Sequence, residues 1–169
     1  EILFIATDLS HYIGDANMPL HTSSNYDGQI THQKGVHALW ESALPQMFGS
    51  AYDFKTAPAK YIPDIAAETW KIIVHSHSLV DTLLAIDRNV RKDFTPETMY
   101  KKDANGKAVM FYNSPVFSDE YAAQFNKALG GMVENQLRLS IYDVACFWYT
   151  AWVNAGSPNL ITLDDPHLT

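Results

Sequence analysis

Two pairs of imidazole and carboxylate side chains stand four residues apart near the start of the sequence. They are His11 with Asp15 and His37 with Glu41. Residues four apart lie one above the other on the same face of an α-helix, so each pair presents a nitrogen and an oxygen side by side. We therefore expect two helices that each offer ligands to a divalent metal ion.

A third imidazole follows the first pair. Pro19 ends the first helix, and His21 then emerges from the turn where that helix stops. Nitrogen and oxygen ligands of this kind suit zinc. Asp8 stands on the same helix face as the first pair and is a candidate to orient a ligand imidazole by hydrogen bonding. A solvated surface position is the alternative for Asp8.

The other histidines are weaker candidates. His77 and Asp81 form a third pair at helical spacing, but His77 falls on an apolar stripe and is interpreted as a packed core histidine, with a functional role left open. His32 lies in a polar loop and is expected to be solvated; as a fourth zinc ligand it would favour a purely structural site. His167 belongs to the C-terminal tail, for which no role is expected.

The elements that must position these residues are helical. The first helix has a packing stripe at Ile2, Ile5, Leu9 and Tyr12 or Ile13, and residues 22–34 form a polar loop beside the site. A second helix is predicted over residues 35–48, with Trp40 and Leu44 on its packing side.

Two longer helices are predicted downstream. One spans residues 63–91, and its apolar stripe consists of Ala66, Trp70, Ile73, His77, Val80 and Leu84. The other begins near Ser118 and reaches residue 152, and Gly130-Gly131 is expected either to kink it or to let another helix approach closely. Residues 92–117 read as a long excursion with a short extended piece over 108–112. The prediction is an all-α multi-helix bundle, a single domain over residues 1–169, with metal ligands facing the interior.

Composition limits the classes of function. The chain has 169 residues, of which 47% are hydrophobic and 12% aromatic, as expected for a globular domain. Its net charge of −7 argues against binding a polyanion through a broad basic surface. No apolar run is long enough to cross a bilayer, and no Gly-rich phosphate loop or nucleophile elbow is present. The single cysteine, Cys146, lies among apolar residues and is interpreted as a buried thiol.

The pattern from His11 to Glu41 resembles a known superfamily. His11-x-x-Gly14-Asp15-x-x-x-Pro19-Leu20-His21 followed by His37-x-x-x-Glu41 is similar to the motif shared by zinc-dependent phospholipase C and the S1/P1 nucleases. These are all-α enzymes with three clustered zinc ions. The resemblance implies that His11 and Asp15 bind a first zinc, that Asp15 bridges it to another and is the candidate catalytic residue, and that His21, His37 and Glu41 complete the remaining site.

Two departures from the family pattern shape the expectation. Family members take further ligands from an upstream segment, including an N-terminal Trp, whereas this chain begins with Glu1 and enters helical periodicity at once. The sequence is therefore expected to lack an N-terminal portion, and of up to three zinc ions in a complete chain the His21, His37 and Glu41 site is the most complete here. Second, the nucleases typically carry Asp at the position of Glu41, which favours the phospholipase C branch.

The predicted function is a zinc-dependent phosphoric diester hydrolase of phospholipase C type that uses a metal-activated water. The substrate is then a phospholipid headgroup ester, and a single-strand nuclease of S1/P1 type is the alternative. A non-catalytic helical binding module stapled by zinc is an alternative from a different class. Family resemblance implies a periplasmic or secreted protein.

Overall fold

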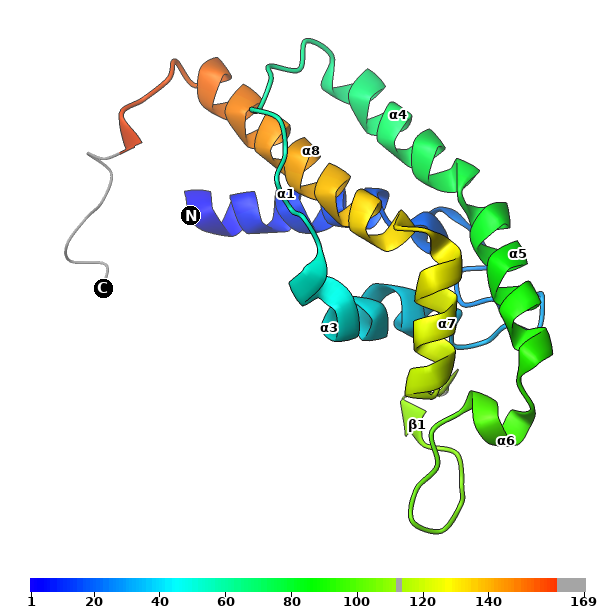
Figure 1. Ribbon diagram of the computed structural model, residues 1–169. Helices are drawn as coiled ribbons and strands as arrows, with labels where there is room; N and C mark the ends of the chain where they lie inside the picture. Colours follow the sequence, from blue (N-terminus) through cyan, green and yellow to red (C-terminus); the bar gives the residue numbers. More distant parts are fainter. Residues whose placement is uncertain (112–113, 161–169) are drawn as a thin grey trace.

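The computed structural model describes residues 1–111 and 114–160, and these are mostly helical, as predicted (Figure 1). Over these residues the only sheet is a short antiparallel pair. The elements in chain order are α1 (Ile2–Ala16), η1 (Pro19–Thr22), α2 (Val36–Ala38), η2 (Leu39–Ala43), α3 (Leu44–Phe48), η3 (Gly49–Ala51), α4 (Ile65–Ser78), α5 (Val80–Val90), η4 (Arg91–Asp93), α6 (Pro96–Met99), β1 (Met110–Phe111), β2 (Ser114–Pro115), α7 (Asp119–Leu129) and α8 (Met132–Asn154).

The larger of two apolar cores lies between α5, α7 and the helical segment 36–48, which comprises α2, η2 and α3. We call this segment the ligand helix. Trp40 and Leu44 are buried in this core, as the sequence predicted. Within the ligand helix, η2 is a π turn, in which the Leu44 amide donates to the carbonyl of Leu39 five residues back.

A buried polar network ties the polar loop to this core. Asp87 on α5 is fully buried and accepts hydrogen bonds from Gln33 (2.7 Å), Arg91 (2.6 Å) and Tyr121 (2.6 Å). The Arg91 guanidinium pairs with the Asp87 carboxylate. The buried carboxylate therefore has both hydrogen-bond donors and an opposite charge beside it, which offset the cost of burying it. The end of the polar loop is thus fixed to both α5 and α7.

The second, smaller core joins α1, α4 and α8 around Ile13, Ile72 and Cys146. The prediction that Cys146 is a buried thiol is confirmed. In Figure 1, α1 crosses α8 and its first turns extend beyond the bundle. The predicted stripe on α1 was wrong at Ile2 and Ile5, which are exposed, whereas of the alternatives Tyr12 and Ile13 the second is buried.

The predicted helix over residues 63–91 is two helices, α4 and α5, separated at Leu79. The Ser78 hydroxyl donates to the carbonyl of His75, competing with the helical ladder where α4 ends. Val80 and Leu84 are buried as predicted. Ala66, Trp70 and His77 were predicted on the packing stripe but are exposed, because α4 turns Ile72 and Ser76 inward instead.

The predicted helix from Ser118 to residue 152 is also two helices, α7 and α8. Gly130 and Gly131 both adopt positive φ (59° and 87°), a left-handed conformation that ends α7 and starts α8 in a new direction. The predicted kink at these glycines is therefore a complete break. Phe125 on α7 is buried, whereas Trp148 on α8 is 47% exposed.

Residues 92–117 contain more structure than the sequence indicated. They hold α6 and a hairpin in which β1 pairs with β2 (Met110 with Pro115, Phe111 with Ser114), extended by isolated bridges outside the strands. The predicted extended piece over 108–112 contains β1, which covers only Met110–Phe111, and Tyr112 and His167 lie outside the described residues. Across the described chain, no helix combines the length and apolarity needed to cross a membrane.

Candidate metal centre

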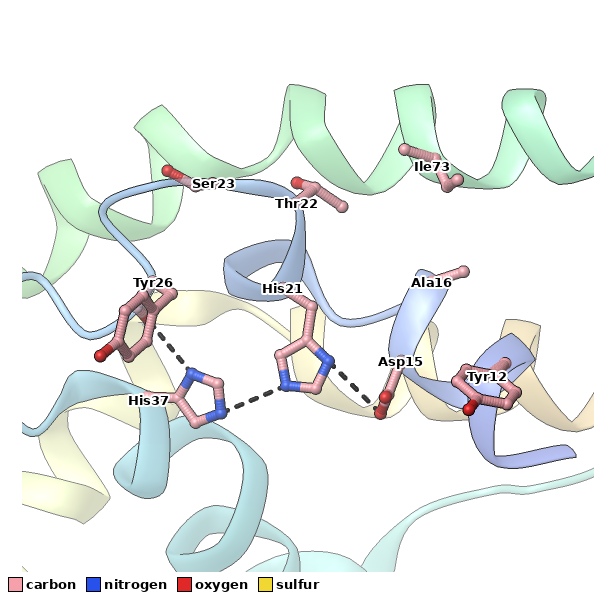
Figure 2. Close-up of a pocket in the computed structure, with 9 residues that line it drawn as sticks. All are labelled: Tyr12, Asp15, Ala16, His21, Thr22, Ser23, Tyr26, His37 and Ile73. Atoms are coloured by element: carbon pink, nitrogen blue, oxygen red, sulfur yellow. Dashed lines mark hydrogen bonds and ion pairs between the residues drawn. The ribbon is translucent and has the colours of Figure 1, made fainter. Parts of the chain in front are cut away.

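Three side chains from two elements converge at one point. His21 belongs to η1, and His37 and Glu41 belong to the ligand helix. The Nε2 atoms of His21 and His37 are 3.3 Å apart, and Glu41 Oε2 lies 2.8 Å from Nε2 of His37 and 3.7 Å from Nε2 of His21. Figure 2 shows the two imidazoles facing each other. Among the described residues, this is the one group of three or more potential ligands close enough to share an ion.

These separations match the needs of a tetrahedral zinc ion. With metal–ligand bonds of about 2.0–2.1 Å and tetrahedral angles, neighbouring ligand atoms stand about 3.3–3.4 Å apart. The His21 to His37 separation has this value, and the two Glu41 distances lie on either side of it. The three side chains therefore fit zinc with small adjustments of Glu41, and they leave a fourth position open.

The second nitrogen of each imidazole has its own acceptor. His21 Nδ1 lies 3.3 Å from a carboxylate oxygen of Asp15, and His37 Nδ1 lies 3.0 Å from the carbonyl oxygen of Tyr26. With a proton on each Nδ1, both Nε2 lone pairs face the shared point. Hydrogen bonds of this kind fix the tautomer and the ring orientation of metal-bound histidines.

The electrostatics of His37 and Glu41 show how closely the two side chains interact. The hydrogen bond that His37 donates to the Glu41 carboxylate raises the pKa of His37 and lowers the pKa of Glu41. When His37 is protonated, its proton lies between these two groups, at the position that a zinc ion would take. Metal binding there requires release of that proton.

The remaining predicted site residues lie close to this group but outside it. Asp15 contacts His21 through one oxygen and approaches His11 Nε2 at 3.4 Å through the other. The side chain of His11 is 71% exposed. Direct zinc binding by His11 and Asp15 stays a prediction. Asp8 is exposed, and no contact places it beside the imidazole that it was predicted to orient.

Neither His32 nor His77 joins the three potential ligands. His32 is exposed in the polar loop and is not part of the group. His77 was predicted to be a packed core residue, and this was wrong: it is exposed, and its Nδ1 lies 3.2 Å from both the hydroxyl and the carbonyl oxygen of Thr22. His77 therefore supports the turn that carries His21.

An open pocket lies beside the two imidazoles (Figure 2). No lysine or arginine is among its lining residues, which are Tyr12, Asp15, Ala16, His21, Thr22, Ser23, Tyr26, His37 and Ile73. The polar loop over residues 22–34 does border the site, as predicted.

Sequence reasoning missed two residues of the loop. The Tyr26 carbonyl orients His37, and the Asp27 side chain binds the backbone at the start of the ligand helix. The Asp27-Gly28 pair indicated a turn, which explains the loop's reversal but not which side chains it would contact.

Comparison of the chain with models of protein families, with curated proteins and with solved structures finds no match. The resemblance to the phospholipase C and nuclease superfamily therefore stays a prediction that depends on the motif between His11 and Glu41. Function is inferred here from the chemistry of the three convergent side chains.

Proposed function

We propose that the protein is a zinc-dependent phosphoric diester hydrolase of phospholipase C type. The observation that carries the proposal is the convergence of His21, His37 and Glu41 with a fourth position left open. Structural zinc sites are closed by four protein ligands, whereas catalytic sites keep a position for water or substrate. Three ligands beside an open pocket favour catalysis over a stapled binding module.

The residues divide into ligands and supporting groups. Nε2 of His21, Nε2 of His37 and a carboxylate oxygen of Glu41 would hold the ion, which when bound would act as a Lewis acid toward a water molecule and a phosphoryl oxygen. Asp15 keeps His21 in the required tautomer through Nδ1. Because Asp15 also lines the pocket, its carboxylate is placed to accept a proton from an attacking water.

The pocket favours a substrate of low net negative charge. It lacks a cationic side chain, and the chain carries a net charge of −7. A zwitterionic headgroup ester suits these surroundings better than a polyanion, whose binding requires neutralised phosphates. The rings of Tyr12 and Tyr26 border the pocket and are able to stack on bases, which keeps single-strand nuclease activity as the second candidate.

Zinc content and two substrate assays test the proposal. We expect about one tightly held zinc ion per chain, measured by inductively coupled plasma mass spectrometry after dialysis. Release of phosphorylated headgroup from phosphatidylcholine would support the phospholipase C type, and nucleotides released from denatured DNA would support the nuclease. Zinc binding without either activity would favour the stapled module, and absence of zinc would overturn all three.

A further inference from the structure

The carboxylate of Asp27 joins three segments of the chain at the start of the ligand helix. One oxygen accepts hydrogen bonds from the backbone amides of Gly35 (3.0 Å) and His37 (3.2 Å). The other accepts a hydrogen bond from the hydroxyl of Ser114 in the hairpin (3.1 Å). Asp27 is partly buried, so these bonds are shielded from water on one side.

The two amides that Asp27 binds need a partner from outside the helix. The first amides of a helix have no acceptor within it and are usually satisfied by a side chain just before the first turn. Here that position is Gly35, which has no side chain to offer. Asp27, ten residues before His37, supplies the missing acceptor.

The same loop also fixes the ring of His37. The Tyr26 carbonyl accepts from Nδ1 of His37, while the next residue, Asp27, binds its backbone amide. The backbone and the ring of one metal ligand are therefore held by consecutive residues. Small movements of this loop would rotate the imidazole away from His21 and Glu41.

The hairpin packs closely against Gly35, at the start of the ligand helix. Gly35 has φ of 96°, and a β-carbon at this position would lie 3.1 Å from both the Phe117 ring and the carbonyl oxygen of Pro115. Ser114 is thus brought to Asp27 by close packing of the hairpin against the start of the ligand helix. This contact links residues 87 positions apart in the sequence.

We propose that Asp27 is a positioning residue of the metal centre, which sets the orientation of His37 and is itself held in place by Ser114. This inference rests on the proposed zinc site. It assigns the hairpin a function in holding the geometry of the metal ligands, beyond its part in the fold.

Zinc affinity and the cobalt spectrum test the inference. We expect Asp27→Ala to weaken zinc binding about 10- to 100-fold, the range for residues that orient metal ligands, and to change the visible absorption of the Co²⁺-substituted protein. Asp27→Asn keeps one acceptor oxygen for the two amides and should bind zinc within about threefold of wild type. Ser114→Ala removes only the hairpin contact and should weaken zinc binding measurably, with less effect than Asp27→Ala.

Asp103→Ala is the matched control. In the exposed turn between the bridged residues Lys102 and Ala108, one carboxylate oxygen of Asp103 likewise accepts from two backbone amides, those of Asn105 and Lys107. Asp103→Ala removes these hydrogen bonds and should leave the zinc affinity and the cobalt spectrum unchanged. Wild-type zinc affinity in Asp27→Ala, or equal weakening in Asp103→Ala, would overturn the inference alone. If Asp27→Ala does not fold, an unchanged affinity in Ser114→Ala overturns it, whereas wild-type protein without zinc would overturn the proposed function itself.

Discussion

The imidazole rings of His21 and His37 stack with their centroids 4.9 Å apart and their Nε2 atoms 3.3 Å apart. Two lone pairs that face each other at this distance repel unless a proton or a metal ion lies between them. Glu41 adds a negative charge 2.8 Å from His37. The arrangement therefore favours a cation at the shared point, which is the basis of the first two predictions.

Replacing Glu41 with Gln should nearly abolish zinc binding. The amide has a similar shape but lacks the charge and the ligand strength of a carboxylate. We expect the affinity to fall by more than about 100-fold, beyond the range for residues that only orient ligands. Competition with a chromophoric chelator measures this. Glu120→Gln, at an exposed position in the first turn of α7, is the control and should bind zinc like wild type.

Zinc should stabilise the folded protein. An ion that binds only the folded state at about 100 times its Kd adds about 2.7 kcal/mol to the free energy of unfolding. Chemical denaturation with zinc and then with excess chelator checks the size and the reversal of this gain. His37→Ala should lose the gain, and a gain that survives in this variant would place the ion elsewhere.

The buried Asp143 should make stability depend on pH. Its carboxylate accepts a hydrogen bond from the Asn17 side chain (3.0 Å), but burial raises its pKa above the ordinary aspartate value. The folded protein then holds the proton more tightly than the unfolded chain does. This group's contribution to stability is complete below the ordinary pKa and is lost as pH rises through the raised folded value.

Asp143→Asn removes that dependence while keeping an acceptor for Asn17. The variant should gain stability relative to wild type when the pH is raised from strongly acidic to neutral, as measured by urea unfolding at both values. Asp81→Asn, at an exposed position on α5, should show a smaller difference. Equal pH dependence in wild type and Asp143→Asn would contradict the prediction.

Replacing Gly35 with Ala should destabilise the protein. The left-handed conformation of a residue other than glycine costs about 1–3 kcal/mol, and the new methyl group would also crowd Phe117 and Pro115. Gly106 has φ of 76°, and a β-carbon added there would meet no atom within 4 Å, so Gly106→Ala carries the conformational cost without the crowding. Thermal unfolding should show the larger loss for Gly35→Ala.

Local spacing was sufficient to predict which potential ligands lie together but not what surrounds them. The separation of His37 and Glu41 by one helical turn, and the position of His21 after Pro19, placed three potential ligands on short elements that the structure brings together. The contact from Asp27 to Ser114 has no local signal, because the two residues are far apart in the sequence and meet only when the hairpin packs.

Helical periodicity also did not determine which face of each helix is buried. A stripe through Trp70 and His77 has the same period as one through Ile72 and Ser76, and only the neighbouring helices decide which stripe is buried. The break at Leu79 was also missed, because the apolar period continues across it from Ile73 to Val80 and Leu84.

The π turn in the ligand helix makes the length of this segment as important as its composition. In a regular α-helix, Leu39 and Leu44 would point about 140° apart, yet both are buried in the same core. The π turn is wider than an α-helical turn and reduces that angle. Its one extra residue lets His37 face the candidate metal centre while Leu39 and Leu44 both face the core. Deletion of a single residue within the π turn would force the helix to lose either its packing or the placement of its potential ligands.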